Sequence, residues 1–508
     1  MKGTRSRDTL AEPTVLAIDV GTSSVRAMLV DARGEAVPGT LTQYRYQLST
    51  SAEGEATIDG DRLVELVART IDGVLEAAGV IAQTIAAVAT DTFWHSLIAV
   101  DAQGQPLLPL ITWEDTRAHA AAAELRALLD ERAIHRRTGA PLQNSYWPAR
   151  LRWLARTRPA LLQESAQWLS FGEFLHRRLL GHSVCSLSMA SGTGLLNLRS
   201  LSWDEDLLQA LAVRREQFPA LGDLRNALQG LRPLYAQRWP LLKDVLWFPA
   251  VGDGAAANVG SGCVVSARYA LTIGTSSALR VTVPADSVEP PPGLWLYLLD
   301  ARRALLGGAL SEGGNLLSWL AEVLRLPPLD EVEPLVSAVP PDSHGLTILP
   351  FLAGERSPGW HANARMTISG LHPKLRPVDL LRAAMEALAY RLAVVYERLN
   401  TQPQLREGGT QIVGSGGALL RSPTLQQIIA DVLGEPLYPL RVREAAVRGV
   451  ALLALEALGL VPDVAQIPPP LAAPVGPDRA RGERYRQALA RQQQLYNLLL
   501  AGDGQTSP

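Results

Sequence analysis

Apolar runs alternate along the chain with turn signals and amphipathic stretches, in the order expected of an α/β protein. Residues 15–18 and 25–30 are apolar and flank a short glycine-bearing turn, which predicts a β-hairpin. A helix is expected to start behind Asp59 or Asp61, because apolar residues recur at helical spacing after this capping position. Residues 84–90 then form a short buried strand. This order predicts an α/β domain rather than a β-sandwich or a helix bundle.

The second half of the chain repeats part of this pattern. Residues 269–271 and 279–283 flank another glycine-bearing turn, which predicts a second hairpin. A long amphipathic helix is expected over residues 378–399. A strand at 411–413 then leads into a glycine-rich loop and a further helix. The chain is therefore expected to contain two related halves.

Length and composition narrow the class of protein. A chain of 508 residues exceeds a single hydrophobic core, so we expect domains at 14–265 and 266–460, followed by a linker, a helix and a tail at 461–508. Basic and acidic residues nearly cancel, 48 against 50, which indicates neither a nucleic-acid partner nor a membrane surface. Cys185 and Cys263 lack metal-ligand spacing, which favours free thiols and a cytoplasmic enzyme without a signal peptide. A homodimer is compatible with the sequence.

The two predicted hairpin turns are nearly identical. The first reads Asp19-Val20-Gly21-Thr22-Ser23-Ser24, and the second reads Thr272-Ile273-Gly274-Thr275-Ser276-Ser277. Glycine lets the backbone approach a ligand closely, while amide N–H and hydroxyl groups can bind phosphate oxygens. One such turn is more often an ordinary hairpin turn than a phosphate site. Two in matching contexts predict a duplicated fold that holds one nucleotide between its halves.

Two carboxylates lie at positions suited to phosphoryl transfer. Asp19 precedes the first turn, where phosphates would repel it unless a cation lay between them, and Mg²⁺ meets that need. The alternative is an aspartate that only initiates the turn. Asp253 precedes a stretch of small residues, 255–260, that is expected to be helical. It can cap this helix, act as the base that accepts a proton from a substrate hydroxyl, or do both.

Two further groups are candidates for ligand binding. Gly414-Ser415-Gly416-Gly417 joins a strand to a helix, where backbone often approaches a nucleotide, although a flexible loop would read the same way. A polar cluster near strand ends could bind a polyol, and it comprises His95, Trp113, Asp115 and Arg117. Taken singly, Trp113 is more often a core residue and Arg117 a solvated charge. Phosphate-loop, dinucleotide, zinc-protease and serine-hydrolase motifs are absent from the sequence.

With these residues assembled, the chain resembles the FGGY family of carbohydrate kinases, whose fold belongs to the actin/hexokinase/Hsp70 ATPase superfamily. The resemblance runs from about residue 15 to about residue 460. It rests on the combination Asp-Val-Gly-Thr-Ser-Ser, Trp-Glu-Asp-Thr-Arg, Gly-Asp-Gly-Ala-Ala-Ala-Asn-Val-Gly, Ile-Gly-Thr-Ser-Ser-Ala and Gly-Ser-Gly-Gly-Ala. It implies two duplicated actin-like, ribonuclease H-like domains with a cleft between them.

The resemblance also implies ATP and Mg²⁺ as cofactors and assigns roles to residues. Asp253 matches the catalytic base, Asp19 lies at the magnesium site, and the first hairpin with Arg26 contacts the ATP phosphates. The remaining nucleotide-pocket positions are Gly274, Thr275, Ser276, Gly314, Gly416 and Gly417. Arg421 stands where many relatives have an asparagine that binds adenine, so this contact differs here.

Within the family, several stretches are most similar to gluconate kinases, namely residues 93–97, 111–117, 188–194 and 354–360. The expected reaction converts ATP and D-gluconate to 6-phosphogluconate and ADP, with the polar cluster and Asp253 around the sugar. His95 and Arg117 are candidates for the substrate carboxylate. A kinase for another sugar or polyol such as xylulose remains an alternative, as does a non-catalytic ATP-binding member. Glycerol kinases carry Arg-Glu at the position of Trp94-His95, which argues against glycerol.

Overall fold

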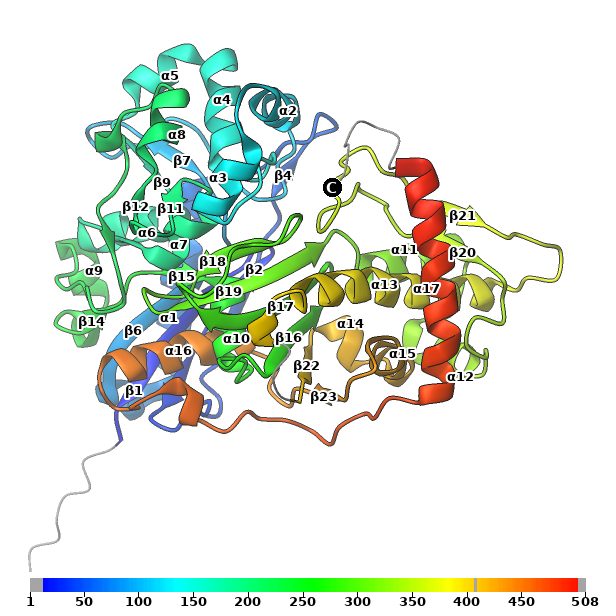
Figure 1. Cartoon of the computed structure of the whole chain (residues 1–508). Coiled ribbons are helices and arrows are strands. Elements are labelled where there is room, and N and C mark those ends of the chain that lie inside the picture. The colour runs from blue at the N-terminus through cyan, green and yellow to red at the C-terminus, as the bar shows by residue number, and fades with distance from the viewer. Residues whose placement is uncertain (1–11, 406–408, 501–508) are drawn as a thin grey trace, which may run out of the picture.

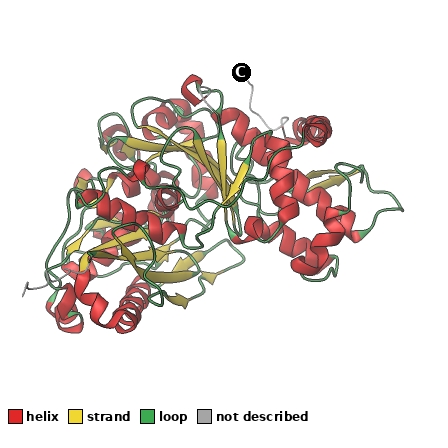
Figure 2. Ribbon diagram, turned by 90° about the horizontal axis from the view of Figure 1, so that it is seen from below, coloured by secondary structure: helices red, strands yellow, loops and turns green. Residues whose placement is uncertain are grey.

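The computed structural model describes residues 12–405 and 409–500. Two six-stranded mixed sheets form the centres of two lobes, with helices packed around them (Figure 1, Figure 2). The first sheet, ordered β14-β6-β1-β2-β3 with β15 beside β6, contains β1 (Thr14–Val20), β2 (Ser24–Asp31), β3 (Thr42–Arg45), β6 (Ile85–Thr92), β14 (Leu246–Trp247) and β15 (Val251–Gly252). The second, ordered β18-β19-β17-β16-β22-β23, contains β16 (Arg268–Ile273), β17 (Ser277–Pro284), β18 (Trp295–Leu298), β19 (Arg303–Leu310), β22 (Gln411–Ser415) and β23 (Leu437–Pro439).

Both sheets are built around the same arrangement of strands. β1 pairs antiparallel with β2 and parallel with β6, and β16 pairs antiparallel with β17 and parallel with β22. Every residue of β1 is buried, as expected of a central strand covered on both faces. The repeated arrangement confirms the predicted duplicated α/β fold.

Helices occupy most of the remaining chain. Asp59 caps the first one, and its side chain accepts a hydrogen bond from the Arg62 backbone at 2.8 Å, as the capping pattern predicts. The helices other than α10 and α16 are α1 (Gly60–Ala78), α2 (His119–Leu128), α3 (Glu131–Thr138), α4 (Trp147–Thr157), α5 (Pro159–Glu164), α6 (Phe171–Leu180), α7 (Leu187–Thr193), α8 (Glu205–Ala210), α9 (Pro233–Arg238), α11 (Gly314–Val323), α12 (Leu329–Ser337), α13 (Pro377–Leu399), α14 (Gly417–Leu420), α15 (Pro423–Leu433) and α17 (Arg479–Leu500).

A subdomain of short elements extends the first lobe at the upper left of Figure 1. Its helices α2 to α8 surround small sheets, and Trp147, Trp168 and Trp203 are buried among them as core residues. The short strands of the protein are β4 (Ser49–Thr50), β5 (Ala56–Ile58), β7 (Ile98–Val100), β8 (Leu110–Ile111), β9 (Gln167–Leu169), β10 (Cys185–Ser186), β11 (Leu196–Asn197), β12 (Ser202–Trp203), β13 (Leu221–Gly222), β20 (Thr347–Leu349) and β21 (Thr367–Ser369).

The C-terminal part of the chain wraps around the second lobe. After α16 the chain runs along the lower edge in Figure 1, where it bridges β23 through Leu437 with Val475. The red helix α17 then packs against α13, α15 and β20. No helix in the described part of the chain has both the length and the apolar character needed to cross a membrane.

Two helices join the lobes. α10 (Asp253–Gly260) follows the first sheet, and α16 (Ala445–Ala457), although late in the chain, packs on β1 and β6 of that same sheet. The helices cross at two glycines. A Cβ atom on Gly449 would lie 1.8 Å from the Ala256 carbonyl oxygen, and one on Gly260 would lie 1.7 Å from the Ala445 oxygen. Only glycine permits this approach, which holds α10 between the lobes.

Substitution of Gly449 tests this crossing. In Gly449→Ala the added methyl group meets helix backbone that cannot rotate away, so we expect the free energy of unfolding to fall by about 2 kcal/mol or more. The matched control is Gly476→Ala, where the new Cβ would meet no atom within 4 Å. Chemical denaturation of both variants measures the difference. Equal stability of the two variants would contradict the crossing geometry.

Candidate active site

The first predicted phosphate turn lies between β1 and β2 and is held from one side by Tyr46. The Gly21 N–H donates to the Ser24 carbonyl at 3.0 Å, and the Tyr46 hydroxyl donates to the Gly21 carbonyl at 2.5 Å. Within the described residues, the Thr22 and Ser23 hydroxyls have no hydrogen-bond partner. A cavity of about 600 Å³ opens beside this turn and is lined by Ser23, Ser24 and Arg26, among others. The turn therefore presents free donors to open space.

The second turn meets two further glycine loops. The Gly314 N–H donates to the Gly274 carbonyl at 2.7 Å, and the Asn315 N–H donates to the Thr275 carbonyl at 3.1 Å. Gly416 has a φ of +92°, and a Cβ there would lie 2.4 Å from the Ile273 carbonyl oxygen. The structure thus brings together the turn and the loops at Gly314 and Gly416, which the family resemblance assigns to a nucleotide pocket.

Asp19 belongs to a row of charged residues that crosses the first sheet. In the strand register Asp19 faces Arg26 on β2 and Asp91 on β6. Residues paired in this way point to the same face of a sheet. The Arg26 guanidinium lies 3.3 Å from Asp19 and 3.1 Å from Glu444, beside α16. Burial raises the pKa of Asp19, and Arg26 opposes that rise.

Asp91 is a member of this row that the sequence pattern did not reveal. The predicted strand ended at residue 90, whereas β6 continues to Thr92 and places Asp91 next to Asp19. Its side chain is fully buried, and no donor group in the described residues hydrogen-bonds to either carboxylate oxygen. Burial raises the pKa of Asp91 well above its ordinary value, and the charges of Asp19 and Asp253 raise it further. In the sequence, the signal that could have indicated Asp91 is its position as a charged residue directly after an apolar strand.

Asp253 is the first residue of α10 and is partly exposed. Its Oδ1 accepts a hydrogen bond from the Gly254 N–H at 2.7 Å. Burial raises the pKa of Asp253 to about 6, with a further upward effect from Asp19 and an opposing one from Arg280. A carboxylate with a pKa near neutrality can accept a proton at physiological pH and release it readily. Asp253 therefore has the properties of a general base.

The indole of Trp94 lies against Gly252 and Gly254, the two neighbours of Asp253 in the chain, and against Gly192. A Cβ on Gly252 would lie 1.9 Å from Trp94, and Cβ atoms on Gly254 and Gly192 would lie 2.5 and 2.3 Å from it. The Trp94 Nε1–H donates to the Ser188 carbonyl at 3.0 Å. Two glycine-containing segments therefore serve to seat one ring, which the sequence pattern did not single out as part of a site.

His95 follows with a left-handed backbone, φ +65°, and its Nδ1 lies 2.5 Å from the Gly192 carbonyl oxygen. Burial, aided by the nearby charges of Arg356 and Arg150, lowers the pKa of His95 to about 3. The rings of Tyr146 and Tyr297 pack edge-on against His95, at 4.8 and 5.7 Å between centroids. His95 is therefore neutral, and with Nδ1–H donating to the carbonyl its Nε2 is free to accept a hydrogen bond.

Asp115 and Arg117 are largely occupied with each other. The Arg117 guanidinium donates hydrogen bonds to both oxygens of the Asp115 carboxylate, and the two that reach Oδ2 are 3.0 and 2.7 Å long. The guanidinium also stacks on Trp153, with 4.7 Å to the ring centroid. Asp115 also accepts a hydrogen bond from the Ala56 N–H at 3.1 Å. These contacts fix the turn at residues 111–117. Trp113, in the same turn, is partly exposed.

Arg356 approaches the same region from the second lobe and was not expected from the sequence. Its guanidinium carbon lies 5.3 Å from the centroid of the Trp113 ring. Burial raises the pKa of Tyr146 and of Tyr297, and the charge of Arg356 acts on both in the opposite direction. Within residues 12–405 and 409–500, the half-buried Arg356 side chain forms no hydrogen bond or ion pair. An uncommitted cation therefore faces the His95 cluster.

Glu355, the residue before Arg356, anchors the loop that carries both residues. The buried Glu355 carboxylate accepts hydrogen bonds from Arg391 on α13 at 2.6 Å and from the Tyr496 hydroxyl on α17 at 2.7 Å. The Trp360 Nε1–H donates to the Gly293 carbonyl at 2.9 Å. The loop that carries Arg356 is thus tied to two helices and to the segment before β18.

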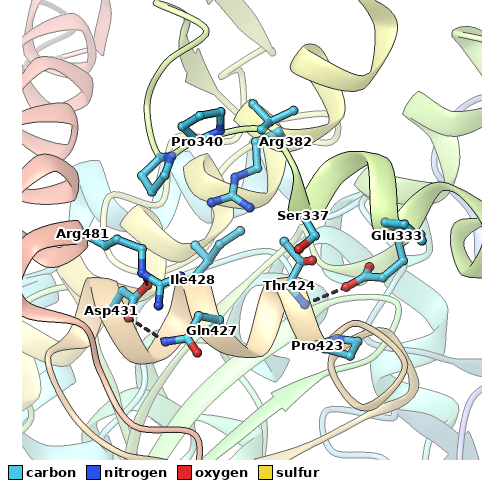
Figure 3. A pocket seen from close by; sticks show the side chains of 13 residues that line it. Glu333, Ser337, Pro340, Arg382, Pro423, Thr424, Gln427, Ile428, Asp431 and Arg481 are labelled. Carbon is cyan, nitrogen blue, oxygen red and sulfur yellow. Dashed lines mark hydrogen bonds and ion pairs between the residues drawn. The ribbon is translucent and has the colours of Figure 1, made fainter.

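Another cavity, of about 450 Å³, lies between α12, α13, α15 and α17 (Figure 3). None of the predicted site residues lines it. Its charged groups bond to nearby protein groups: Glu333 accepts a hydrogen bond from the Thr424 N–H at 2.6 Å, and Arg481 lies 3.2 Å from Asp431. The candidate chemistry is therefore gathered around the two hairpins and α10.

Comparison with known proteins identifies the family. Residues 14–260 match the sequence model of the FGGY family of carbohydrate kinases, N-terminal domain, and residues 269–458 match that of the C-terminal domain. Gluconokinase of Bacillus subtilis is 26% identical over 458 residues, 88% of each chain.

Solved structures of sugar kinases resemble this chain over nearly its whole length. Gluconate kinase from Lactobacillus acidophilus has a TM-score of 0.87 at 26% identity, covering 96% of this chain and 98% of its own. A xylulose kinase from the same species gives the same TM-score and identity, with 96% and 99% covered. The chain belongs to the FGGY family of carbohydrate kinases, phosphotransferases that move a phosphoryl group from ATP to a hydroxyl group of a sugar.

Proposed function

We propose that this kinase phosphorylates D-gluconate to 6-phosphogluconate. The observation that carries the proposal is the uncommitted Arg356 facing His95, Tyr146 and Tyr297. Gluconate is an anion, and a buried carboxylate needs a cation or a group of N–H donors. His95 is neutral and Arg117 is bonded to Asp115, so neither residue expected from the sequence supplies a free charge. The planar guanidinium of Arg356 suits a carboxylate, to which it can donate two parallel hydrogen bonds.

Asp253 is the proposed catalytic base. Its carboxylate accepts the proton of the substrate's primary hydroxyl, and that oxygen attacks the γ-phosphorus of ATP while the bond to the β–γ bridging oxygen breaks and ADP leaves. The helix start of α10 fixes the carboxylate, and the Trp94 ring beside it excludes water from one side. His95 and Trp113 orient the sugar through a hydrogen-bond acceptor and an apolar face. Asp115 and Arg117 contribute by holding the Trp113 turn.

The nucleotide is proposed to lie between the two hairpins. Gly21, Thr22, Ser23, Ser24 and Arg26 on one side, and Gly274, Thr275, Ser276, Gly314, Gly416 and Gly417 on the other, offer backbone N–H groups, hydroxyls and a guanidinium to the phosphates. A Cβ on Gly417 would lie 3.6 Å from the guanidinium of Arg421, so the Arg421 side chain lies beside the part of the proposed nucleotide pocket that would hold adenine.

Asp19 is the proposed magnesium ligand. Its carboxylate lies beside the first turn, and an oxygen ligand next to phosphates is what Mg²⁺ prefers. When bound, Mg²⁺ neutralises charge on the phosphates during transfer. Residues 14–265 and 266–460 are proposed to act as two lobes that close over the ligands, and residues 461–500 are proposed to brace them.

A kinase for an uncharged sugar such as xylulose is the second candidate, because a xylulose kinase matches the structure as well as a gluconate kinase does. In that case Arg356 would donate hydrogen bonds to sugar hydroxyls. The non-catalytic alternative is disfavoured by the position and raised pKa of Asp253.

Replacing Asp253 tests the proposed base. Asp253→Asn keeps the shape of the side chain but cannot accept the proton, so we expect kcat to fall by about 10²-fold or more while ATP affinity and thermal stability change little. Steady-state ADP release and thermal unfolding measure both quantities. Asp286→Asn, on an exposed loop, is the matched control. Near-normal turnover of Asp253→Asn would remove Asp253 as the base.

The pH profile provides a second test of Asp253. The active form is the carboxylate, and its pKa is raised to about 6, so protonation inactivates the site as the pH falls through that value. We expect kcat/KM for the sugar to be constant near pH 8 and to fall about tenfold per unit below pH 6. A profile that stays flat to pH 5 would contradict the raised pKa.

Replacing Arg356 tests whether this residue binds the carboxylate of a sugar-acid substrate. Arg356→Gln should lower kcat/KM for D-gluconate by roughly 10- to 100-fold, because a charge-assisted hydrogen bond to the carboxylate is lost. The inhibition constant of D-glucitol, the uncharged six-carbon polyol, should stay within about twofold. Arg365→Gln removes an exposed cation from the same segment and serves as the control. Equal losses for gluconate and D-glucitol would show that Arg356 does not read the carboxylate.

A further inference from the structure

Asp91 lies one strand away from the proposed magnesium ligand. The parallel register of β1 and β6 pairs Asp19 with Asp91, so both side chains emerge on the face covered by α10 and α16. On the other side, Asp91 pairs with Val251 of β15, two residues before Asp253. Asp91 therefore stands between the proposed metal ligand and the proposed base.

Within residues 12–405 and 409–500, the arginines beside Asp19 and Asp253 are already engaged with groups other than Asp91. Arg26 is on the far side of Asp19 and is shared between Asp19 and Glu444. Arg280, the cation near Asp253, donates to Asn258 at 2.9 Å and to Thr272 at 2.8 Å. The carboxylate of Asp91 is fully buried, and no donor in the described residues reaches it. Arg26 lowers the pKa of this carboxyl, but burial and the charges of Asp19 and Asp253 outweigh that effect.

An uncompensated buried carboxylate is costly to a fold, and proteins keep such groups mainly at functional sites. A proton shared with Asp19 would neutralise one charge but would leave the remaining oxygens unsatisfied. A divalent cation would satisfy both carboxylates together, and Mg²⁺ is commonly held by one or two carboxylates with phosphate oxygens and water.

We propose that Asp91 is a second protein ligand, beside Asp19, for the divalent cation of this kinase. The inference rests on the magnesium site proposed at Asp19 and adds a residue to it. Two carboxylates give the protein its own affinity for the cation before the nucleotide arrives. The site then favours a metal-loaded state in which the first turn, Asp19 and Asp91 face the phosphates together.

The test uses Mn²⁺ as the probe and the full-length protein without nucleotide. Loss of the free Mn²⁺ signal in electron paramagnetic resonance gives the dissociation constant, and thermal unfolding with and without Mn²⁺ gives a second readout. We expect Asp91→Asn to weaken Mn²⁺ binding at least about tenfold. We also expect this variant to unfold at a higher temperature than the wild type without metal, because it removes a buried, repelled charge, and to lose the stabilisation by Mn²⁺.

Two further variants separate the possible results. Asp342→Asn controls for binding elsewhere, because Asp342, His344 and Glu386 form another group that could hold a metal ion. If Asp19→Asn abolishes Mn²⁺ binding and Asp91→Asn leaves it unchanged, Asp91 is no ligand while the site at Asp19 stands. If the wild type binds no Mn²⁺, or neither variant alters binding, both assignments are overturned.

Discussion

Electrostatic repulsion among Asp19, Asp91 and Asp253 is the constraint on which the arrangement of this protein depends. The three carboxylates are gathered at the junction of the lobes, where burial raises the pKa of each. Against this charge stand Arg26, which is shared between Asp19 and Glu444, and Arg280, which lowers the pKa of Asp253. A cation and the donors of the two phosphate turns would complete the balance. The junction is thus suited to bind a metal and a nucleotide, and burial together with repulsion from Asp19 gives Asp253 a pKa suited to proton transfer.

The scaffold holds these groups with small residues. The glycines at the α10–α16 crossing let two helices approach within backbone contact, and that contact fixes the start of α10 and so Asp253. Further glycines seat the Trp94 ring against the same residue. On the second lobe, the Glu355 contacts to α13 and α17 hold Arg356 opposite the His95 cluster. The C-terminal helix, which lies beyond the family match at residue 458, therefore supports the proposed sugar site.

Local patterns in the sequence predicted the hairpins, several of the helices, the duplicated fold and the positions of Asp19 and Asp253, because a strand, a turn and a cap are each encoded within a few residues. Groups defined by tertiary packing could not be predicted in this way. Asp91 joins the site only through the register of β1 with β6. The sequence also does not show that Arg117 has a carboxylate partner and that Arg356 has none among the described residues. Trp94 becomes a wall of the site because glycines from two distant segments leave room for it. Such pairings are set by the whole fold.

The central claim is that this kinase acts on a sugar acid, and the most direct measurement is ADP release by the purified protein with ATP and Mg²⁺. The acceptors to compare are D-gluconate, xylulose, ribulose, glycerol and erythritol, each over a range of concentrations. We expect the highest kcat/KM with D-gluconate and phosphate on its primary hydroxyl. Release with xylulose or another uncharged acceptor, and none with D-gluconate, would contradict the claim.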